Sequence, residues 1–229
     1  LGDVYKRQGL QYTYKLNKKN TINIGAVYTL GRTLHGDAYK YHQTGAESNG
    51  SIYVQSQTGD TIPNPFKMPH TFGIGLTYVY DNRLTIGVDY TLQKWNTADL
   101  AWSKFNKESV EMNSRTKIAF GAEFVPSYIS HNYLKRIRYR MGAYYSSPYN
   151  KVSYTSPDTG TTSFQDGARE YGVSIGFGLP MFQSKSMLNI SGQYIKVSPK
   201  FKGLMEENYL RINIGLTFNE RWFMKWKVD

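Results

Sequence analysis

The triplet formed by Asp158, Thr159 and Gly160 has the sequence of the aspartic-protease motif. Catalysis by such a motif requires a second, paired carboxylate and a buried loop with apolar flanks. Here Ser156 and Pro157 precede the triplet, and two threonines follow it. These neighbours indicate an ordinary polar connection, so we expect no protease activity from this segment.

The histidines are the other side chains suited to catalysis or metal binding, and all four fall in segments that we expect to connect strands: His35, His42, His70 and His131. His35 and His42 share one connection and could hold a metal ion or haem, but their spacing does not demand it. A hydrolase built into a β-barrel would need a serine and a histidine on neighbouring strands. No histidine lies within a predicted strand, so we expect no enzyme activity, no metal and no cofactor.

A net charge of +11 raises the question of a nucleic-acid or phosphate site. The basic residues are spread along the whole chain, and the densest group lies at residues 134–140. Its arginines Arg136, Arg138 and Arg140 recur at every second position, so they share one face if the segment is a strand. This pattern favours a structural or pore-lining row over a phosphate site.

Alternation of apolar and polar residues dominates the chain and predicts an all-β protein. Most alternating segments are longer than the about 5 to 6 residues usual in soluble strands. They meet the about 9 to 11 residues that a membrane-spanning strand needs, and no apolar run reaches the about 18 to 20 residues of a membrane helix. The nine predicted strands are residues 9–16, 20–32, 69–80, 83–95, 115–126, 135–146, 169–180, 186–197 and 208–219.

The two faces of these strands differ sharply in charge. One face carries long series of apolar and aromatic side chains that contain no charged residue, such as Leu210, Ile212, Ile214, Leu216 and Phe218. A basic residue facing lipid costs about 2–4 kcal/mol at the bilayer midplane, so lipid contact demands such segregation. The opposite face holds glycines, small polar residues and six charged residues that we expect to form a polar network facing the lumen: Asp89, Glu123, Arg138, Arg140, Glu170 and Arg211.

Two alternatives explain this segregation: a membrane barrel with its apolar face outward, or a soluble lipocalin-like binding protein with that face inward. The strands are too long for most sandwiches, and glycines on the polar face would weaken a water-facing sheet. We therefore predict a transmembrane antiparallel β-barrel in the outer membrane of a Gram-negative bacterium.

Short and long connections alternate along the chain. Because outer-membrane barrels have short periplasmic turns and longer extracellular loops, this order places the C-terminus on the periplasmic side. An odd count of nine strands indicates that N-terminal strands are missing, since such barrels have even numbers. We expect residues 1–8 to be a non-native artefact, residues 9–219 a partial barrel, and residues 220–229 either an interfacial tail rich in tryptophan and lysine or a solvated terminus.

Several segments together resemble the FadL/TodX family of outer-membrane transporters, in its Bacteroides-type branch. They are KMPHTFGIGLTYVYDNRLTIGVDYTLQKW, RTKIAFGAEFVP, IRYRMGAYYSSPY, REYGVSIGFGLP and YLRINIGLTFN. The resemblance implies a fourteen-stranded barrel plugged by an N-terminal hatch, of which this chain supplies about the last nine strands without the hatch. It also implies a monomeric channel for passive uptake of long-chain fatty acids or other hydrophobic compounds, surrounded by outer-membrane lipid.

By its order, the connection at residues 33–68 corresponds to the family's extracellular loop that shapes the first hydrophobic groove. Its apolar residues either line that groove or pack the loop onto itself: Leu34, Ile52, Val54, Ile62, Phe66 and Met68. A second functional interpretation is a FadL-like scaffold that docks protein partners in a secretion system. Long polar loops that hold stable partners would favour the scaffold.

Overall fold

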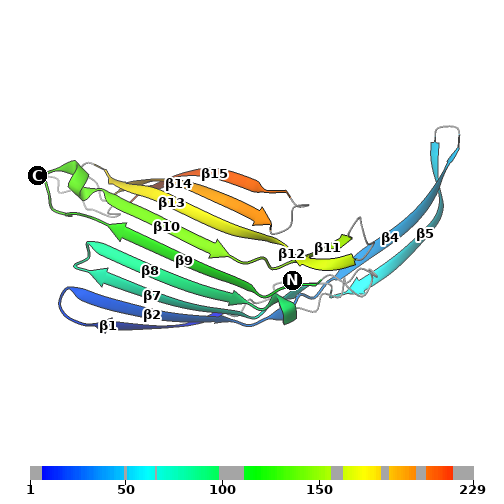
Figure 1. Ribbon diagram of the computed structural model, residues 1–229, viewed down its shortest axis with the longest axis horizontal. Coiled ribbons are helices and arrows are strands. Elements are labelled where there is room, and N and C mark those ends of the chain that lie inside the picture. Colours follow the sequence, from blue (N-terminus) through cyan, green and yellow to red (C-terminus); the bar gives the residue numbers. More distant parts are fainter. Residues whose placement is uncertain are drawn as a thin grey trace, which may run out of the picture.

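The computed structural model describes residues 7–48, 51–64, 66–97, 111–155, 162–181, 186–199 and 205–218. Nine strands form one antiparallel sheet in the order β1-β2-β7-β8-β9-β10-β13-β14-β15, and Figure 1 shows them side by side in a single layer. Their bounds are β1 Arg7–Lys15, β2 Asn20–Thr29, β7 Thr71–Tyr80, β8 Leu84–Gln93, β9 Arg115–Phe124, β10 Arg138–Ser146, β13 Ala168–Pro180, β14 Met187–Pro199 and β15 Glu207–Thr217.

Each of the nine predicted strands corresponds to one strand of this sheet, so the all-β antiparallel prediction is confirmed. Tight turns join several neighbours. Between β7 and β8, for example, Asp81 and Asn82 adopt positive φ angles of 48° and 54°, which short polar residues tolerate better than most. The Arg83 N–H donates to the Tyr80 carbonyl at 2.8 Å and closes this turn.

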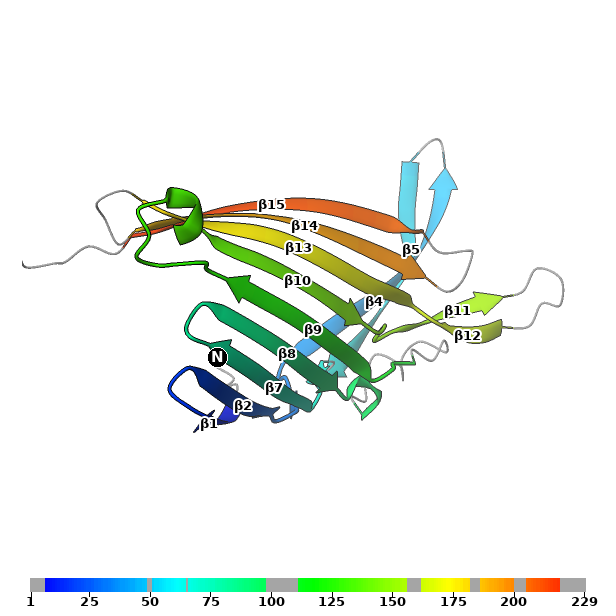
Figure 2. The same ribbon diagram turned by 60° about the vertical axis from the view of Figure 1, so that its left-hand side comes forward.

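The sheet is curved but not closed into a barrel. In Figure 2, β1 and β15 form its opposite edges. Every residue of β1 and of β15 is exposed, and no further strand pairs with either edge in the described part of the chain. Residues 1–6 and the expected tail at residues 220–229 lie outside the described residues, as does the triplet at 158–160. Of residues 1–8, which we expected to be a non-native artefact, Arg7 and Gln8 are the first two residues of β1.

Two of the long connections between the predicted strands contain additional strands. Strands β4 (Asp37–Ser48) and β5 (Ser51–Pro63) pair as a long hairpin, and β11 (Lys151–Thr155) pairs with β12 (Thr162–Asp166). A two-residue ladder between β3 (Arg32–Thr33) and β6 (Lys67–Met68) joins the long hairpin to the sheet. These segments lack a regular apolar alternation but contain Thr and Tyr, which are enriched in strands. We call residues 37–63 the arm; Figures 1 and 2 show it projecting beyond the sheet.

The molecule has almost no conventional core. Among the described residues, only four hydrophobic side chains are buried: Ile62, Val125, Ile137 and Ile195. The accessible surface is 17563 Å², whereas a compact monomer of 26.3 kDa exposes about 10,600 Å². No helix in the described ranges is long and apolar enough to cross a membrane. A sheet with no second layer over either face among the described residues, together with the projecting arm, agrees with this large surface.

Candidate functional site

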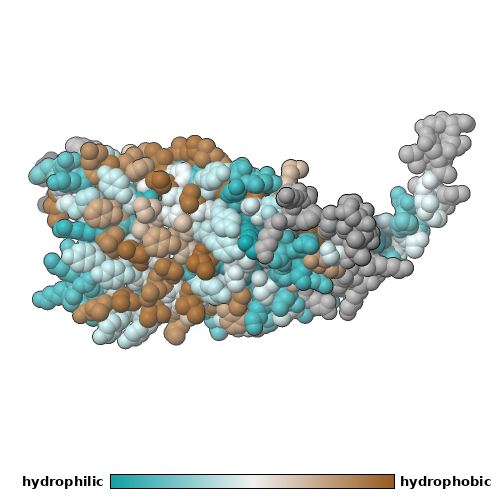
Figure 3. Space-filling view, viewed as in Figure 1, coloured by the Kyte–Doolittle hydropathy of each residue, from teal (hydrophilic) through white to brown (hydrophobic). Residues whose placement is uncertain are grey.

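The apolar face of the sheet is exposed across its width, from strands near one edge to strands near the other. Ile74 on β7 is 61% exposed, Met141 on β10 is 61%, Ile175 on β13 is 63% and Ile214 on β15 is 73%. Brown hydrophobic side chains accordingly form patches over the strands in the space-filling view of Figure 3. Apolar areas of this extent mark contact with lipid or with another protein.

On the polar face, Glu123 pairs with two arginines of the neighbouring strand. Its two carboxylate oxygens lie 3.0 Å from Arg138 Nη1 and 2.7 Å from Arg140 Nε. Arg140 also donates to Asn189 Oδ1 on β14 at 2.8 Å, reaching over β13. This reach is possible because β13 presents Gly176 there, whose position lies against the Arg140 side chain. The structure thus brings three of the six predicted residues into one charge-assisted cluster.

A second cluster on the same face surrounds Glu170. The Tyr144 hydroxyl donates to the Glu170 carboxylate at 2.5 Å, and Arg115 Nη2 lies 3.5 Å from it. The Tyr144 ring covers Gly172, where an added Cβ would collide with it. Glu170 therefore belongs to a group separate from that of Glu123. Arg211 lies on the edge strand β15, opposite Gln193 of β14.

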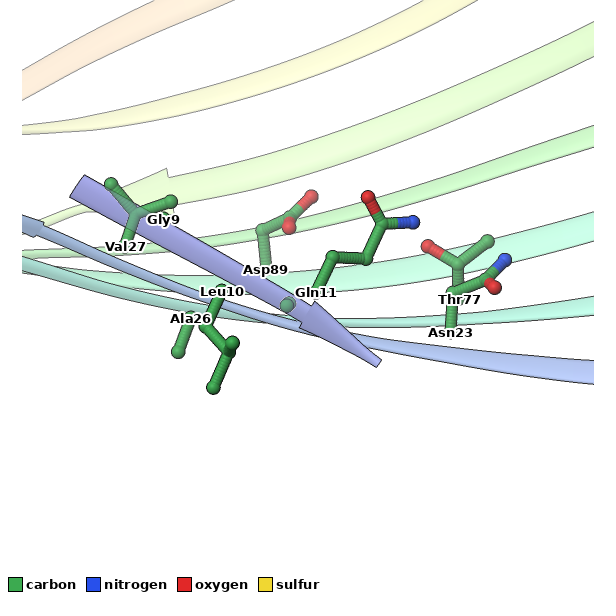
Figure 4. Close-up of a pocket in the computed structure, with 10 residues that line it drawn as sticks. Gly9, Leu10, Gln11, Asn23, Ala26, Val27, Thr77 and Asp89 are labelled. Carbon is green, nitrogen blue, oxygen red and sulfur yellow. The ribbon is translucent and has the colours of Figure 1, made fainter. Parts of the chain in front are cut away.

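Asp89, the sixth predicted residue, lies apart from both clusters. Its carboxylate covers Gly75 on β7, where an added Cβ would require the carboxylate to shift. Together with Gln11 and Thr77 it lines a hollow of about 420 Å³ near the β1 edge. In Figure 4 these three side chains project to one side of the sheet, whereas Leu10 and Ala26 project to the other.

Several members of the two clusters were not predicted from the sequence. Arg115 and Lys117 alternate on β9 with Glu123, and Tyr144 alternates on β10 with Arg138 and Arg140, so strand parity alone places them on the polar face. The Lys117 ammonium lies 4.5 Å from the centre of the Tyr144 ring. Parity also places Asn189 on the polar face, but it does not predict the contact with Arg140, because that partner lies two strands away in the sheet.

The six apolar residues predicted for a groove are not gathered in one place. Leu34, Phe66 and Met68 lie at the base of the arm, where the Leu34 N–H donates to the Phe66 carbonyl at 2.9 Å. Ile62 is fully buried there, while Phe66 is 61% exposed and Met68 40%. Ile52 and Val54 lie further along β5, where Ile52 is opposite Glu47 of β4. Ile52 is ten residues from Ile62, a separation of about 33 Å along an extended strand.

Comparison with known proteins identifies a different family from the one expected. A family model described as BamG matches the chain over residues 1–229. Comparisons with curated proteins and with solved structures give no match. The BamG family is associated with the Gram-negative outer membrane, which agrees with the predicted location. The family match does not show that the chain crosses this membrane as a β-barrel.

The resemblance to FadL/TodX transporters was therefore wrong. The segments that supported it show alternating strands, mid-strand glycines and prolines at strand ends. Any two-faced antiparallel sheet of this length uses these features, so they indicate a class of fold and not a family. The functions drawn from the resemblance were wrong with it: fatty-acid uptake, a hydrophobic small-molecule partner and a scaffold in a secretion system.

Proposed function

Because the chain belongs to the BamG family, we propose that it acts in outer-membrane protein assembly, as a non-enzymatic component that associates with proteins of the BAM complex. The observation that carries this proposal is the family match over all 229 residues. The exposed surfaces of the structure support it, since they suit contacts with lipid and with protein.

We further propose that the nine-stranded sheet forms part of the wall of a transmembrane β-barrel. Its strands have 9 to 13 residues, and its apolar face is free of charge over its central part. In a bilayer each unpaired backbone group would cost several kcal/mol, so both edge strands must be hydrogen-bonded to other strands there. Residues 220–229, which hold Trp222 and Trp226, would anchor the chain at the periplasmic interface.

The arm is the element that we propose for contact with other proteins. Tyr39 and Tyr41 project from one face of β4 and are 63% and 62% exposed. Exposed tyrosines supply large contact areas at low entropic cost and recur at the centres of protein interfaces. The arm also has two strand edges with no partner strand among the described residues, so an extended segment could add to it as a further strand.

Depletion and co-purification test this function together. The full protein is purified with an affinity tag from outer membranes of its own organism, and folded outer-membrane proteins are counted after its depletion. We expect BAM proteins to co-purify and the amount of several unrelated folded outer-membrane proteins to fall. A depleted strain that assembles all of them normally, with no BAM protein in the eluate, would refute the proposal.

The arm's part is tested by a double variant, Tyr39→Ala with Tyr41→Ala. It should reach the membrane normally and lose most of its co-purifying protein. The matched control, Gln43→Ala with Gln57→Ala, removes one exposed side-chain hydrogen bond of the same hairpin and no aromatic area. Equal loss of partners in both double variants would show that hairpin order, not the tyrosines, makes the contact.

A further inference from the structure

A hollow of about 370 Å³ lies where the arm joins the sheet. We call it the rim pocket. It is lined by the β3–β6 ladder, by the segment before β7 and by the residues that follow β8, and its side chains include Arg32, Lys67, His70, Phe72 and Lys94. None of the functions proposed above uses this pocket.

The rim pocket is basic. Arg32, Lys67 and Lys94 contribute three positive charges, and no carboxylate of the described residues lines the pocket. In the described part of the chain these three cations form no ion pair. Arg115, Arg138 and Arg140 on the polar face, in contrast, all pair with a glutamate. Three uncompensated cations around a small volume attract an anion with several oxygen acceptors.

His70 adds a neutral donor to this charge. The Gly31 N–H donates to His70 Nδ1 at 3.2 Å, and the Tyr28 hydroxyl lies 2.8 Å from the same nitrogen. Because a backbone N–H can only donate, Nδ1 must be the acceptor, and the proton of the neutral ring therefore lies on Nε2. A Cβ at Gly31 would lie 2.8 Å from the Met68 carbonyl and 2.9 Å from His70 Cδ2, so glycine keeps the pocket wall closely packed.

The rim pocket is continuous with the apolar face. Phe72 belongs to that face, is 41% exposed, and also lines the pocket. Lys94 Nζ lies 5.6 Å from the centre of the Phe72 ring, so a cation is placed beside an exposed aromatic ring. Tyr28 packs on Phe72 with ring centres 4.9 Å apart. From the centre of the sheet toward the rim pocket, apolar side chains are followed by aromatic rings and then by basic side chains. A lipid layer has the matching order: acyl chains, then the interface, then the phosphate groups.

We propose that the rim pocket binds the phosphate group of an anionic membrane lipid, whose acyl chains lie along Phe72 and the apolar face. This inference rests on the proposed placement of that face in the membrane. The cations hold the phosphate oxygens, and His70 Nε2 donates a further hydrogen bond. A free phosphate ion makes the same polar contacts but none with the apolar face, so it binds much more weakly.

The test measures lipid binding to the purified full-length protein in detergent micelles by native mass spectrometry. Three probes are compared: dioleoyl phosphatidic acid, dioleoylglycerol with the same acyl chains but no phosphate, and inorganic phosphate. We expect phosphatidic acid to bind at least tenfold more tightly than dioleoylglycerol, and millimolar inorganic phosphate to displace little of it. Full displacement of phosphatidic acid by inorganic phosphate would show that the rim pocket is a simple anion site and not a lipid site.

The variants locate the binding. Arg32→Gln with Lys94→Gln should weaken phosphatidic acid binding about tenfold, whereas Lys18→Gln with Lys19→Gln removes equal charge in the turn before β2 and should change it little. Unchanged binding in the first double variant would overturn the inference. Should that variant lose its strand circular dichroism, Lys94→Gln alone is used, with a smaller loss of about threefold expected and rescue by Lys94→Arg.

Failure of this inference is distinguishable from failure of the proposed function. Wild-type protein and both double variants are fractionated from cells, and the outer-membrane fraction is assayed for the protein. Protein absent from that fraction would contradict the proposed membrane placement itself. Protein present there, with the same lipid affinity in both double variants, would contradict only the rim pocket.

Discussion

The nine-stranded sheet and the arm are both antiparallel, yet different forces hold them. The sheet is wide, and side chains on its polar face connect neighbouring strands through ion pairs and, where Arg140 reaches over Gly176 to Asn189, through a hydrogen bond. The arm has only two strands, which the described side chains connect through weak contacts such as Gln43 with Gln57 at 3.1 Å. A two-stranded hairpin alone is marginally stable in water, so the arm depends on its base.

This difference separates two tasks. The exposed apolar side chains of the sheet have no protein cover in the described structure, which suits the proposed contact with lipid. The described side chains of the arm are mostly polar or tyrosine and suit contact with water or protein. If the proposed placement holds, partners could contact the arm outside the membrane without disturbing the strands of the sheet.

The largest expected effect tests whether the apolar face of the sheet contacts lipid. Ile175→Lys places a charge in the middle of β13 on the apolar face, and we expect the free energy of unfolding to fall by about 2–4 kcal/mol in lipid vesicles. Ser174→Lys, one residue away on the polar face, serves as the matched control and should lose much less. The measurement is urea unfolding in vesicles followed by tryptophan fluorescence. Equal losses in the two variants would contradict a lipid-facing surface.

The next effect tests whether the arm is anchored only at its base. Ile62 is fully buried, and the Asn64 N–H donates to the Gly36 carbonyl at 2.8 Å beside it. Ile62→Ala should destabilise the arm locally by about 2–3 kcal/mol, because a large-to-small change in a buried site leaves a cavity. Amide hydrogen exchange should accelerate across residues 37–63 and stay unchanged in β8 and β9. Thr61→Ala, at an exposed neighbouring position, is the control, and acceleration throughout the sheet would contradict a separable arm.

The strands of the sheet were predictable from sequence because an apolar side chain at every second position is a direct consequence of a two-faced strand. The arm was not predictable in this way, since neither face of β4 or β5 is consistently apolar. The members of the charged clusters could be assigned to a face by parity, but their partners could not. Partners such as Glu170 and Arg115 depend on which strands are neighbours and in which register, and one sequence does not contain that information.

A smaller effect tests the role of glycine in the sheet. The ring of Tyr144 lies on Gly172, so Gly172→Ala must push the ring away and disturb its hydrogen bond to Glu170. We expect a loss of about 1–2 kcal/mol, as is usual for overpacking. Gly121→Ala is the matched control, because an added Cβ there would meet no atom within 4 Å. A loss of similar size at Gly121 would mean that backbone freedom, not the tyrosine, accounts for the effect.

The smallest effect concerns the charge balance of the polar face. Glu123→Gln leaves Arg138 and Arg140 without their carboxylate, but all three side chains are partly exposed, at 27%, 32% and 38%. Solvent screening therefore limits the expected loss to about 1 kcal/mol. Asp81→Asn is the control, since it removes the 3.4 Å pair with Arg83 at a turn where asparagine tolerates the positive φ. Raising the salt concentration should shrink the Glu123→Gln loss. A loss that is independent of salt would assign the stabilisation to the packing of these long side chains over β13 instead of to their charges.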